Sequence, residues 1–530
     1  MNTLAQPIND SVRNTKNNRI NIRGNKPRVI FNDDCYELER EDSDTPDGFL
    51  SRRLKPLSGT HVTTIAYSVL EGDAPVYDSN VQPIFGDAHG GPSPYWGNIT
   101  RNIKVLKQSG YCPIQLITDF AHSNAMEMFA SIRMNDVHDS FIPQWFALWK
   151  VAHPELLVDT NGMLPEFELY TSAQDFIHEP VRRRKLEIVE EIVDRYDVDG
   201  FELDYIRHPV LFSRRMRGEP CVQEEIEVMN AFMADIRALA DSRAEGGGRP
   251  VLIAARVPDS IGQCLDNGLD VREWIEKDLV DILIVGGGYA PCSLPVGEFI
   301  EIARPHGVQV YPCINQGPTD ELSGNSFLEC VRGLASTWYR DGVDGLYFWN
   351  LGTPFEYKVG EDLVRTRDRV YSCLDEVGDP DMLVGKSKMF CADSGPTAVR
   401  FHYQHISSRW PLPIKSKHAK GNLQKGVIGR VPIRVGDEVE KDNPERIVFT
   451  VEFDDPSWRD VLLFRLNGEE LKDGKFIGAV DGKNECRLDY DVSVPPLRVG
   501  LNFVEVVARH VDIPGDPVNI NNMRLCVDYA

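Results

Sequence analysis

The chain has 530 residues, more than one hydrophobic core usually organises, so we expect two domains or a large barrel with an accessory module. Hydrophobic residues make up 42% and charged residues 26%, as in ordinary globular proteins, and no run of 18 or more apolar residues predicts a membrane span. The net charge of -23 argues against a general nucleic-acid binder, because such proteins normally present a basic surface.

The 11 cysteines are spread from Cys35 to Cys526, without a CxxC pair or a cysteine–histidine cluster at zinc spacing. We expect most of them to be buried free thiols, and the sequence implies no metal ion and no organic cofactor. Residues 1–27 are polar and lack the apolar centre of a secretory signal, so they predict a disordered leader. The sequence does not decide between two locations: the cytoplasm, or secretion directed by a signal that is absent from this sequence.

Eight short apolar runs, each ending at a polar or glycine-rich loop, predict strands that are buried on both faces. They are Arg28–Phe31, Val62–Val69, Glu127–Met134, Val198–Tyr205, Val251–Val257, Asp281–Val285, Val308–Ile314 and Gly345–Trp349. Helical patterns lie between them, at Trp96–Ser109, Pro180–Tyr196, Cys221–Ala244, Val271–Asp278, Pro295–Arg304 and Ser326–Arg340.

Eight strands with helical crossovers predict a (β/α)8 TIM barrel over residues 28–380. The alternative is an open doubly wound sheet. That fold needs a glycine-rich phosphate loop after its first strand, and this chain has Asn32-Asp33-Asp34-Cys35 there.

The pattern changes after about residue 380. A polar stretch rich in proline and lysine predicts a linker over 381–425, and short alternating segments predict a small antiparallel β-sandwich over 426–530. The segments are Val448–Phe453, Val461–Arg465, Phe476–Val480, Cys486–Val492, Leu501–Ala508 and Met523–Val527. We expect this accessory domain to pack on the barrel and stabilise it, with carbohydrate binding as the alternative.

The fourth predicted strand carries the densest set of polar side chains at the barrel's carboxyl-terminal end, where active sites of this fold lie. Because side chains alternate along a strand, Glu202 and Asp204 should face the barrel axis, and two inward carboxylates are costly unless paired or functional. Glycoside cleavage needs one carboxylate at the oxocarbenium-like centre and one protonated carboxyl at the leaving oxygen. The pattern predicts Asp204 as nucleophile or stabiliser and Glu202 as acid or modulator. A structural ion pair of Glu202 with Arg133 or Arg256 is the alternative.

The run VDGFELDYIRHP, from Val198 to Pro209, resembles the strand-four signature of the hypothetical glycosyl hydrolase family 10-like group. Residues 113–139 resemble that group's helix followed by a strand that ends in polar residues, and the His153-Pro154 pair continues the resemblance, which covers about residues 28–370. It implies a barrel that acts on glycosidic bonds and does not identify the sugar.

The chain differs from two other glycosidase families. Family 18 chitinases carry their acid where Ile206 stands, and the alpha-amylase superfamily has a glutamate at the end of strand five, where this chain has Asp259, so the acid is not identified.

Polar residues at the other strand ends supply further candidates. Asp136 and Asp259 are candidate catalytic acids, with Asp33 in reserve. The expected sugar contacts are Asp33, Arg133, Asn135, His138, Arg207, His208, Arg256, Tyr289, Asn315, Trp349 and Asn350. The indole of Trp349 suits sugar stacking, because its apolar face covers the C–H face of a pyranose. An oxygen-ligand site for calcium or magnesium is an alternative use of Asp33, Asp34, Asp136 and Asp139.

The loop after strand four holds Arg207, Arg214, Arg215 and Arg217 in an otherwise acidic chain. Arginine forks suit sulfate and carboxylate groups, so an anionic polysaccharide is one hypothesis for the substrate. Ion pairs with Glu219, Glu224 or Glu225 are the alternative. The sequence therefore predicts a glycosidase acting on a poly- or oligosaccharide. A non-catalytic carbohydrate-binding barrel and a metal-dependent hydrolase are the competing interpretations.

Overall fold

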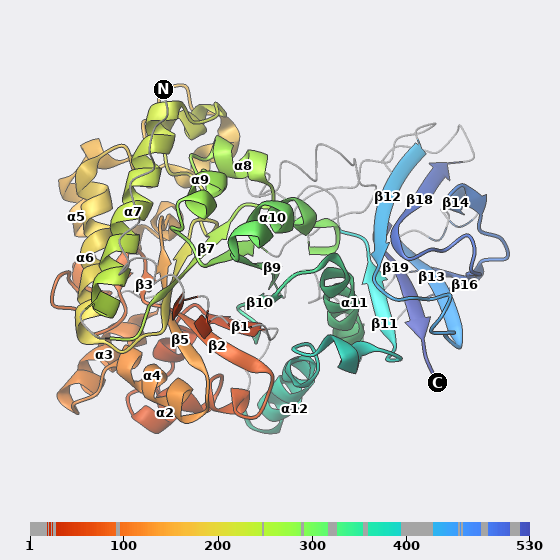
Figure 1. Ribbon diagram of the computed structural model, residues 1–530, viewed down its shortest axis with the longest axis horizontal. Coiled ribbons are helices and arrows are strands. Elements are labelled where there is room, and N and C mark those ends of the chain that lie inside the picture. The colour runs from red at the N-terminus through yellow and green to blue at the C-terminus, as the bar shows by residue number, and fades with distance from the viewer. Residues whose placement is uncertain are drawn as a thin grey trace, which may run out of the picture. The chain divides into compact units, whose positions relative to one another are not determined.

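Eight parallel strands form a closed barrel in the computed structural model (Figure 1), in the order β1-β10-β9-β8-β7-β6-β5-β2. Their bounds are β1 Arg28–Asp33, β2 Val62–Ser68, β5 Glu127–Arg133, β6 Gly200–Asp204, β7 Leu252–Val257, β8 Ile282–Val285, β9 Gln309–Asn315 and β10 Gly345–Trp349. Every residue of β1 and of β6 to β10 is buried, as expected for strands covered on both faces. The predicted barrel and all eight predicted strands are confirmed.

The structure describes a defined set of residues: 18, 19, 21, 22, 24, 28–91, 96–245, 248–287, 291–315, 326–352, 359–393, 428–453, 456, 459, 461–478, 486–508 and 520–530. Tyr289, an expected sugar contact, lies outside them. So do most of the predicted leader and residues 394–425 of the predicted linker.

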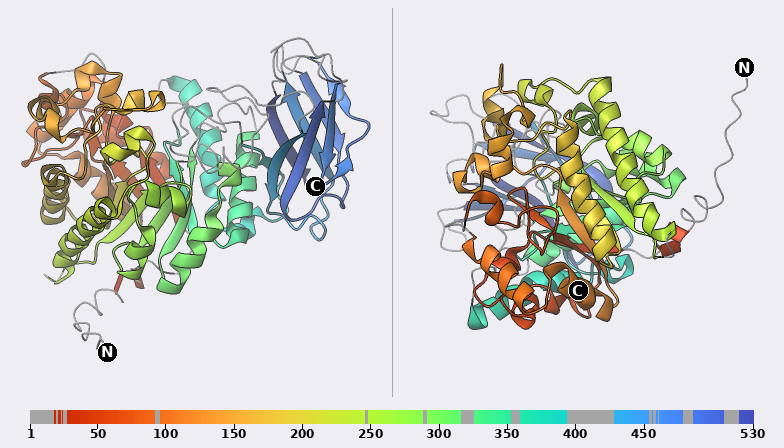
Figure 2. Two further views of the ribbon diagram at one scale, coloured as in Figure 1. Left: turned by 90° about the horizontal axis from the view of Figure 1, so that it is seen from above. Right: turned by 90° about the vertical axis from the view of Figure 1, so that its left-hand side faces the viewer.

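Helices follow most barrel strands, and Figure 2 shows several of them lying against the outside of the strands. The six predicted helices are confirmed as α3 Gly97–Gln108, α6 Glu179–Arg195, α7 Gln223–Glu245, α9 Val271–Glu276, α10 Val296–Ala303 and α11 Ser326–Asp341. Among the described residues, four further helices were not predicted: α2 Pro46–Ser51, α5 Leu148–Ala152, α8 Ile261–Asp266 and α12 Gly360–Tyr371, whereas α4 Pro113–Ser123 is the helix that the resemblance over residues 113–139 implies. Three of them have five or six residues, too few for an apolar pattern to repeat.

The chain is organised in two compact units. The first comprises Met1–Val285 and Glu298–Tyr311, and the second comprises Gly286–Gly297 and Pro312–Ala530. Two antiparallel sheets in the second unit confirm the predicted β-sandwich, with strand orders β11-β19-β13-β17-β16 and β12-β18-β14-β15. Apolar side chains from both sheets form one core, which includes Ile433, Phe449 and Val504. The strand bounds are β11 Lys388–Cys391, β12 Ile428–Val435, β13 Arg446–Phe453, β14 Leu462–Leu466, β15 Glu469–Glu470, β16 Lys475–Ile477, β17 Cys486–Asp491, β18 Gly500–Ala508 and β19 Ile520–Asp528.

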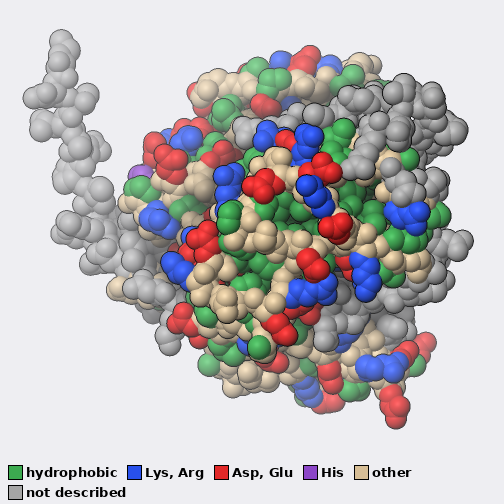
Figure 3. Space-filling view, turned by 90° about the vertical axis from the view of Figure 1, so that its right-hand side faces the viewer, with side chains coloured by type: hydrophobic (Ala, Val, Ile, Leu, Met, Phe, Trp, Pro, Cys, Tyr) green, Lys and Arg blue, Asp and Glu red, His purple; other side chains and the backbone are tan. Residues whose placement is uncertain are grey.

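Strand β11 lies within the stretch predicted as linker, so the sandwich draws on residues before the predicted boundary at 426. With four residues, Lys-Met-Phe-Cys, it is too short to show an alternating pattern. Among the described residues, no helix combines the length and the apolar character needed to cross a membrane. Acidic and basic side chains are interspersed on the face of the molecule shown in Figure 3.

Arg19, which lies within the predicted leader, is only 2% exposed and binds three carboxylates. Its guanidinium pairs with Asp241 of α7 at 3.0 Å, with Asp281 at 3.1 Å and with Asp278. Burial acts to lower the pKa of Arg19, but the three carboxylates outweigh it and raise that pKa. Asp281 directly precedes β8, so this part of the leader is fixed near the amino-terminal end of the strand.

Replacing Arg19 with methionine is expected to lower the free energy of unfolding by about 2 to 4 kcal/mol, because it leaves buried carboxylates without one of their cations. Chemical denaturation measures the change. Arg183→Met is the matched control, since this exposed helical arginine makes only surface ion pairs and should change stability by about 0.5 kcal/mol or less. Equal effects of the two substitutions would contradict a fixing role for Arg19.

Candidate active site

Glu202 and Asp204 lie on the inner face of the barrel, as the alternation along β6 predicts. The opposite face of the same segment meets the helices: the Tyr205 hydroxyl donates to the Met233 sulfur of α7 at 3.0 Å. On the inner face, Gly200 is needed for space, because a Cβ there would come within 2.7 Å of the Phe129 ring. Both carboxylates are almost completely buried, Glu202 one layer below Asp204.

The Asp204 carboxylate is fixed by three hydrogen bonds. Its Oδ1 accepts from the backbone N–H groups of Ile206 at 3.0 Å and Arg207 at 2.9 Å, and its Oδ2 accepts from Arg256 Nη1 at 3.0 Å. Arg256 stands beside Asp204 in the register of β6 and β7. These contacts orient a carboxylate at the carboxyl-terminal end of the strand, and they give the predicted sugar contact Arg256 a role in positioning Asp204.

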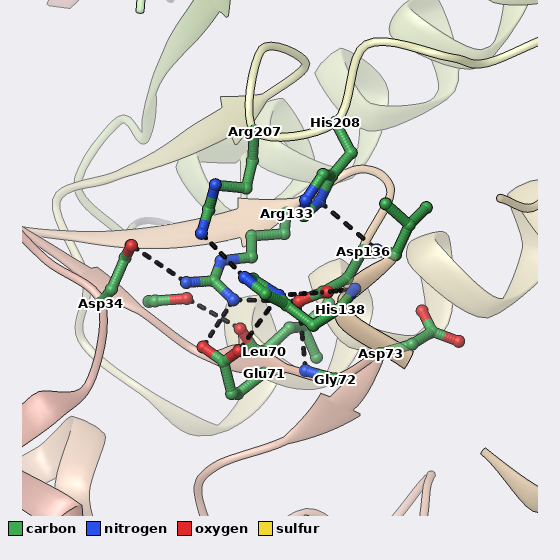
Figure 4. Close-up of polar contacts among 12 residues, drawn as sticks. Asp34, Leu70, Glu71, Gly72, Asp73, Arg133, Asp136, His138, Arg207 and His208 are labelled. Atoms are coloured by element: carbon green, nitrogen blue, oxygen red, sulfur yellow. Dashed lines mark hydrogen bonds and ion pairs between the residues drawn. The ribbon is translucent and has the colours of Figure 1, made fainter. Parts of the chain in front are cut away.

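Arg133, at the end of β5, is surrounded by three carboxylates (Figure 4). Its guanidinium pairs with Glu71 at 2.5 Å, Asp136 at 2.9 Å and Asp34 at 3.0 Å. All four side chains are buried. One cation among three carboxylates leaves an excess of negative charge away from water, and binding a proton relieves that excess.

Glu71 holds a proton more readily than Asp136 does. Burial raises the pKa of Glu71 to about 8. Arg133 opposes the rise, while Asp136 and Asp34 add to it. Asp136 behaves in the opposite way: burial would raise its pKa, but His138 and Arg133 hold it well below its usual range. Within the described part of the chain, Oε1 of Glu71 has no hydrogen-bond partner, and it lies 3.6 Å from His138 Nδ1.

Glu71 was not among the residues predicted from the sequence. It lies in β3, Leu70–Glu71, which forms a short hairpin with β4, Ala74–Pro75, directly after β2. The sequence did contain a pattern that could have indicated Glu71, because Glu71-Gly72-Asp73 follows the second apolar run and provides two carboxylates at a strand end. What the sequence could not give was the approach of this hairpin to Arg133.

His138 connects the Arg133 cluster to the partly exposed Arg207. Its Nδ1 lies 2.6 Å from Asp136 Oδ1, and its Nε2 lies 2.8 Å from Arg207 Nη2. A guanidinium only donates, so Nε2 accepts and the proton sits on Nδ1, toward Asp136. Burial lowers the pKa of His138; Asp136 raises it and Arg207 lowers it, and the balance keeps the ring neutral near pH 7.

Asp136, His138 and His208 offer ligand atoms within 4.8 Å of one another, a geometry that could hold a metal ion. The hydrogen bonds of these residues argue against a metal site. His138 engages both ring nitrogens, and His208 Nδ1 accepts from the Val137 N–H at 3.3 Å. The Arg207 cation beside His138 would also repel a metal ion. We interpret Asp136 and His138 as a hydrogen-bonded pair that orients Arg207, with the His208 ring packed against His138.

The four aspartates considered for calcium or magnesium each have a cationic partner from the chain. Asp33 pairs with Arg53 at 2.7 Å and Asp139 with Lys150 at 2.8 Å, while Asp34 and Asp136 share Arg133. The fold therefore disperses these carboxylates over three cations.

Removal of divalent cations is expected to leave catalytic activity within about twofold, because the candidate ligands are already hydrogen-bonded within the chain. Dialysis against EDTA followed by a rate assay tests this, with a zinc-treated sample as the control. A loss of activity that zinc, calcium or magnesium restores would instead favour a metal-dependent hydrolase.

Other predicted site residues are located as follows. Asn135 donates to the carbonyls of Gln174 and Val210 and accepts from the Gln174 N–H, so its side chain ties two loops together. Asp33 lies beside Arg53 and is not brought to the Arg133 cluster. Asp259 is completely buried just after β7. His208 packs edge-on against His138, with ring centroids 4.9 Å apart.

Three further predicted contacts belong to the second compact unit: Asn315, Trp349 and Asn350. They stand at the carboxyl-terminal ends of β9 and β10, and each is nearly fully buried. Their roles in sugar binding stay predictions.

Three of the four arginines in the loop after β6 have partners within that region. Arg214 and Arg217 pair with Glu219 at 3.0 and 3.7 Å, the alternative considered from the sequence. Arg215 is buried and donates to the Glu219 carbonyl at 2.8 Å, and also to Asn267 Oδ1 at 2.9 Å. Arg207 is thus the one member of this set that contacts the His138 group in the described residues.

No family model matches the chain, and no curated protein matches it in sequence. The resemblance to the hypothetical glycosyl hydrolase family 10-like group therefore stays a prediction. Solved structures similar to this chain include several glycoside hydrolases. The α-L-fucosidase isoenzyme 2 from Paenibacillus thiaminolyticus is 14% identical, with a TM-score of 0.43 over 70% of this chain and 52% of its own, so this chain spans about half of its length.

Two others have similar scores. The glycoside hydrolase domain of PgaB (BpsB) from Bordetella bronchiseptica is 10% identical, with a TM-score of 0.41 over 65% of this chain and 99% of its own. A family GH18 chitinase from Chromobacterium violaceum is 11% identical, with a TM-score of 0.38 over 94% of this chain and 92% of its own. At these values the likeness does not extend to an activity or a substrate.

Proposed function

We propose that this protein is a glycoside hydrolase in which Asp204 is the nucleophile or the stabiliser of the oxocarbenium-like centre. The observation that carries the proposal is a fixed carboxylate at the inner rim of a barrel, together with a second carboxyl that keeps its proton near neutral pH. Glycosidic cleavage requires this division of roles between two carboxyl groups.

Asp204 suits the first role because Arg256 and two backbone N–H groups hold its carboxylate in one orientation. A preoriented negative charge stabilises positive charge that develops at the anomeric carbon without first having to reorganise.

Glu71 is our proposal for the proton donor. Glu71 pairs with Arg133, and Arg133 stands beside Asp204 in the register of β5 and β6. Asp136 is a weaker candidate, because its pKa is held well below the usual range. Glu202 and Asp259 stay as further candidates, and both are completely buried.

Arg207 and His138 are the partly exposed members of this group. An anionic group on the substrate would bind Arg207 in preference to the His138 ring, because a charge-assisted hydrogen bond from Arg207 is stronger than its bond to a neutral imidazole. We therefore retain a sulfated or uronic polysaccharide as the preferred substrate class, resting on Arg207 alone. A non-catalytic carbohydrate-binding barrel is the competing function.

Product analysis tests the proposal. The protein is incubated with a panel of plant and marine polysaccharides that includes matched sulfated and desulfated samples, and new reducing ends are measured. Products that form with the wild type and not with Asp204→Asn support glycoside hydrolysis. Binding without any products would favour the carbohydrate-binding alternative, and equal turnover of the matched samples would remove the anionic preference.

A further inference from the structure

Phe141 is a large aromatic side chain left half-exposed next to the candidate active site. It is 52% exposed, and it follows η4, His138–Ser140, in the segment after β5. Its ring contacts the ring of His138 edge-on, with centroids 5.4 Å apart and an angle of 72° between the planes. His138 thus contacts Phe141, Arg207 and Asp136.

The turn that presents Phe141 is fixed by hydrogen bonds. The N–H groups of Phe141 and Ile142 both donate to the His138 carbonyl, at 3.1 and 2.7 Å. The buried Lys150 ammonium donates to the Asp136 carbonyl at 2.9 Å and to Asp139 at 2.8 Å. A ligand that stacks on this ring would therefore meet a side chain whose backbone is already ordered.

Exposure alone does not distinguish Phe141, because single exposed apolar residues are common on protein surfaces. Leu148, Val151 and Leu169 in the same long segment are exposed by 53%, 60% and 56%. Phe141 differs from them by being aromatic and by its contact with His138. A flat apolar face beside a hydrogen-bonding group matches a sugar ring, which has an apolar C–H face and a polar edge.

We propose that Phe141 is a stacking platform for a sugar ring of the substrate, beside a polar contact supplied by Arg207. This inference rests on the proposed function, because it assigns a binding position to the same site. The ring covers the C–H face of the sugar, and Arg207 donates a hydrogen bond to a hydroxyl oxygen or an anionic substituent at the sugar's edge. Phe141 thereby contributes to affinity for the substrate and takes no part in bond cleavage.

The test is Phe141→Ala, compared with Phe141→Trp and with the control Leu169→Ala. The probe is a hexasaccharide prepared from the polysaccharide of the panel that the wild type cleaves. We expect Phe141→Ala to raise KM about tenfold with kcat within about twofold. Phe141→Trp should retain the wild-type KM, and Leu169→Ala should resemble the wild type in both constants.

Binding gives a second readout that does not depend on turnover. In an Asp204→Asn background, calorimetry should show the dissociation constant for the same hexasaccharide rising about tenfold on Phe141→Ala. Equal KM and affinity for Phe141→Ala and Leu169→Ala, with wild-type hydrolysis intact, would overturn the stacking role alone. If the wild type cleaves no member of the panel, both the proposed function and this inference fail.

Discussion

Replacing Asp204 with asparagine is expected to lower kcat/KM on the order of 10³-fold or more, with substrate binding retained. The amide keeps the size of the side chain but removes the negative charge that would stabilise or attack the anomeric centre. It also turns one of the accepting oxygens into a donor, which loses a bond to Arg256 or to the backbone N–H groups. Steady-state kinetics on the cleaved polysaccharide measures the change.

Two controls separate chemistry from folding. Circular dichroism and thermal unfolding should show that Asp204→Asn remains folded. Glu202→Gln replaces the neighbouring inward carboxyl in the same strand and should lower the rate less, if Glu202 only modulates Asp204. A folded Asp204→Asn variant with wild-type activity would contradict the proposed mechanism, and a larger loss with Glu202→Gln would transfer the main role to that residue.

Replacing Glu71 with glutamine is expected to lower kcat on the order of 10²- to 10⁴-fold and to remove the alkaline limb of the pH–rate profile. The pKa of Glu71 is about 8, so its proton is present below that pH and is lost as the pH rises through it. Wild-type activity should therefore fall above about pH 8. Glutamine can still accept from Arg133 but has no acidic proton to give.

A substrate with an activated aryl leaving group distinguishes a proton donor from a merely structural residue. Such a leaving group needs little protonation, so it should restore much of the activity of Glu71→Gln. Stability gives an independent check. The pKa of Glu71 in the folded protein lies above its ordinary value of 4.5. The contribution of Glu71 to the free energy of unfolding is therefore fully present below pH 4.5 and is lost as the pH rises toward 8. An unchanged alkaline limb in Glu71→Gln would move the search for the acid to Glu202 and Asp259.

The barrel could be predicted because each strand is buried on both faces and therefore appears in the sequence as a continuous apolar run. The inward position of Glu202 and Asp204 follows from the alternation of side chains along a strand, which depends on sequence order alone. Tyr205, with its contact to α7, marks the other face.

The partners of the polar residues could not be predicted in the same way, because they depend on segments far apart in the sequence. Asn135 looked available for sugar, but the carbonyls of Gln174 and Val210 occupy its amide. Arg214 looked available for an anionic substrate, but Glu219 pairs with it. Glu71 was missed because its elevated pKa comes from burial beside Asp136 and Asp34, and that burial depends on where the hairpin after β2 packs.

The three carboxylates around Arg133 together set the pH at which Glu71 loses its proton. Asp34, Glu71 and Asp136 all compete for one guanidinium, so the affinity of any one of them for a proton depends on the charge carried by the other two. Neutralising Asp34 would release Arg133 toward Glu71 and lower the pH at which Glu71 ionises. The acidity of the proposed proton donor is thus controlled by a side chain that need never touch a sugar.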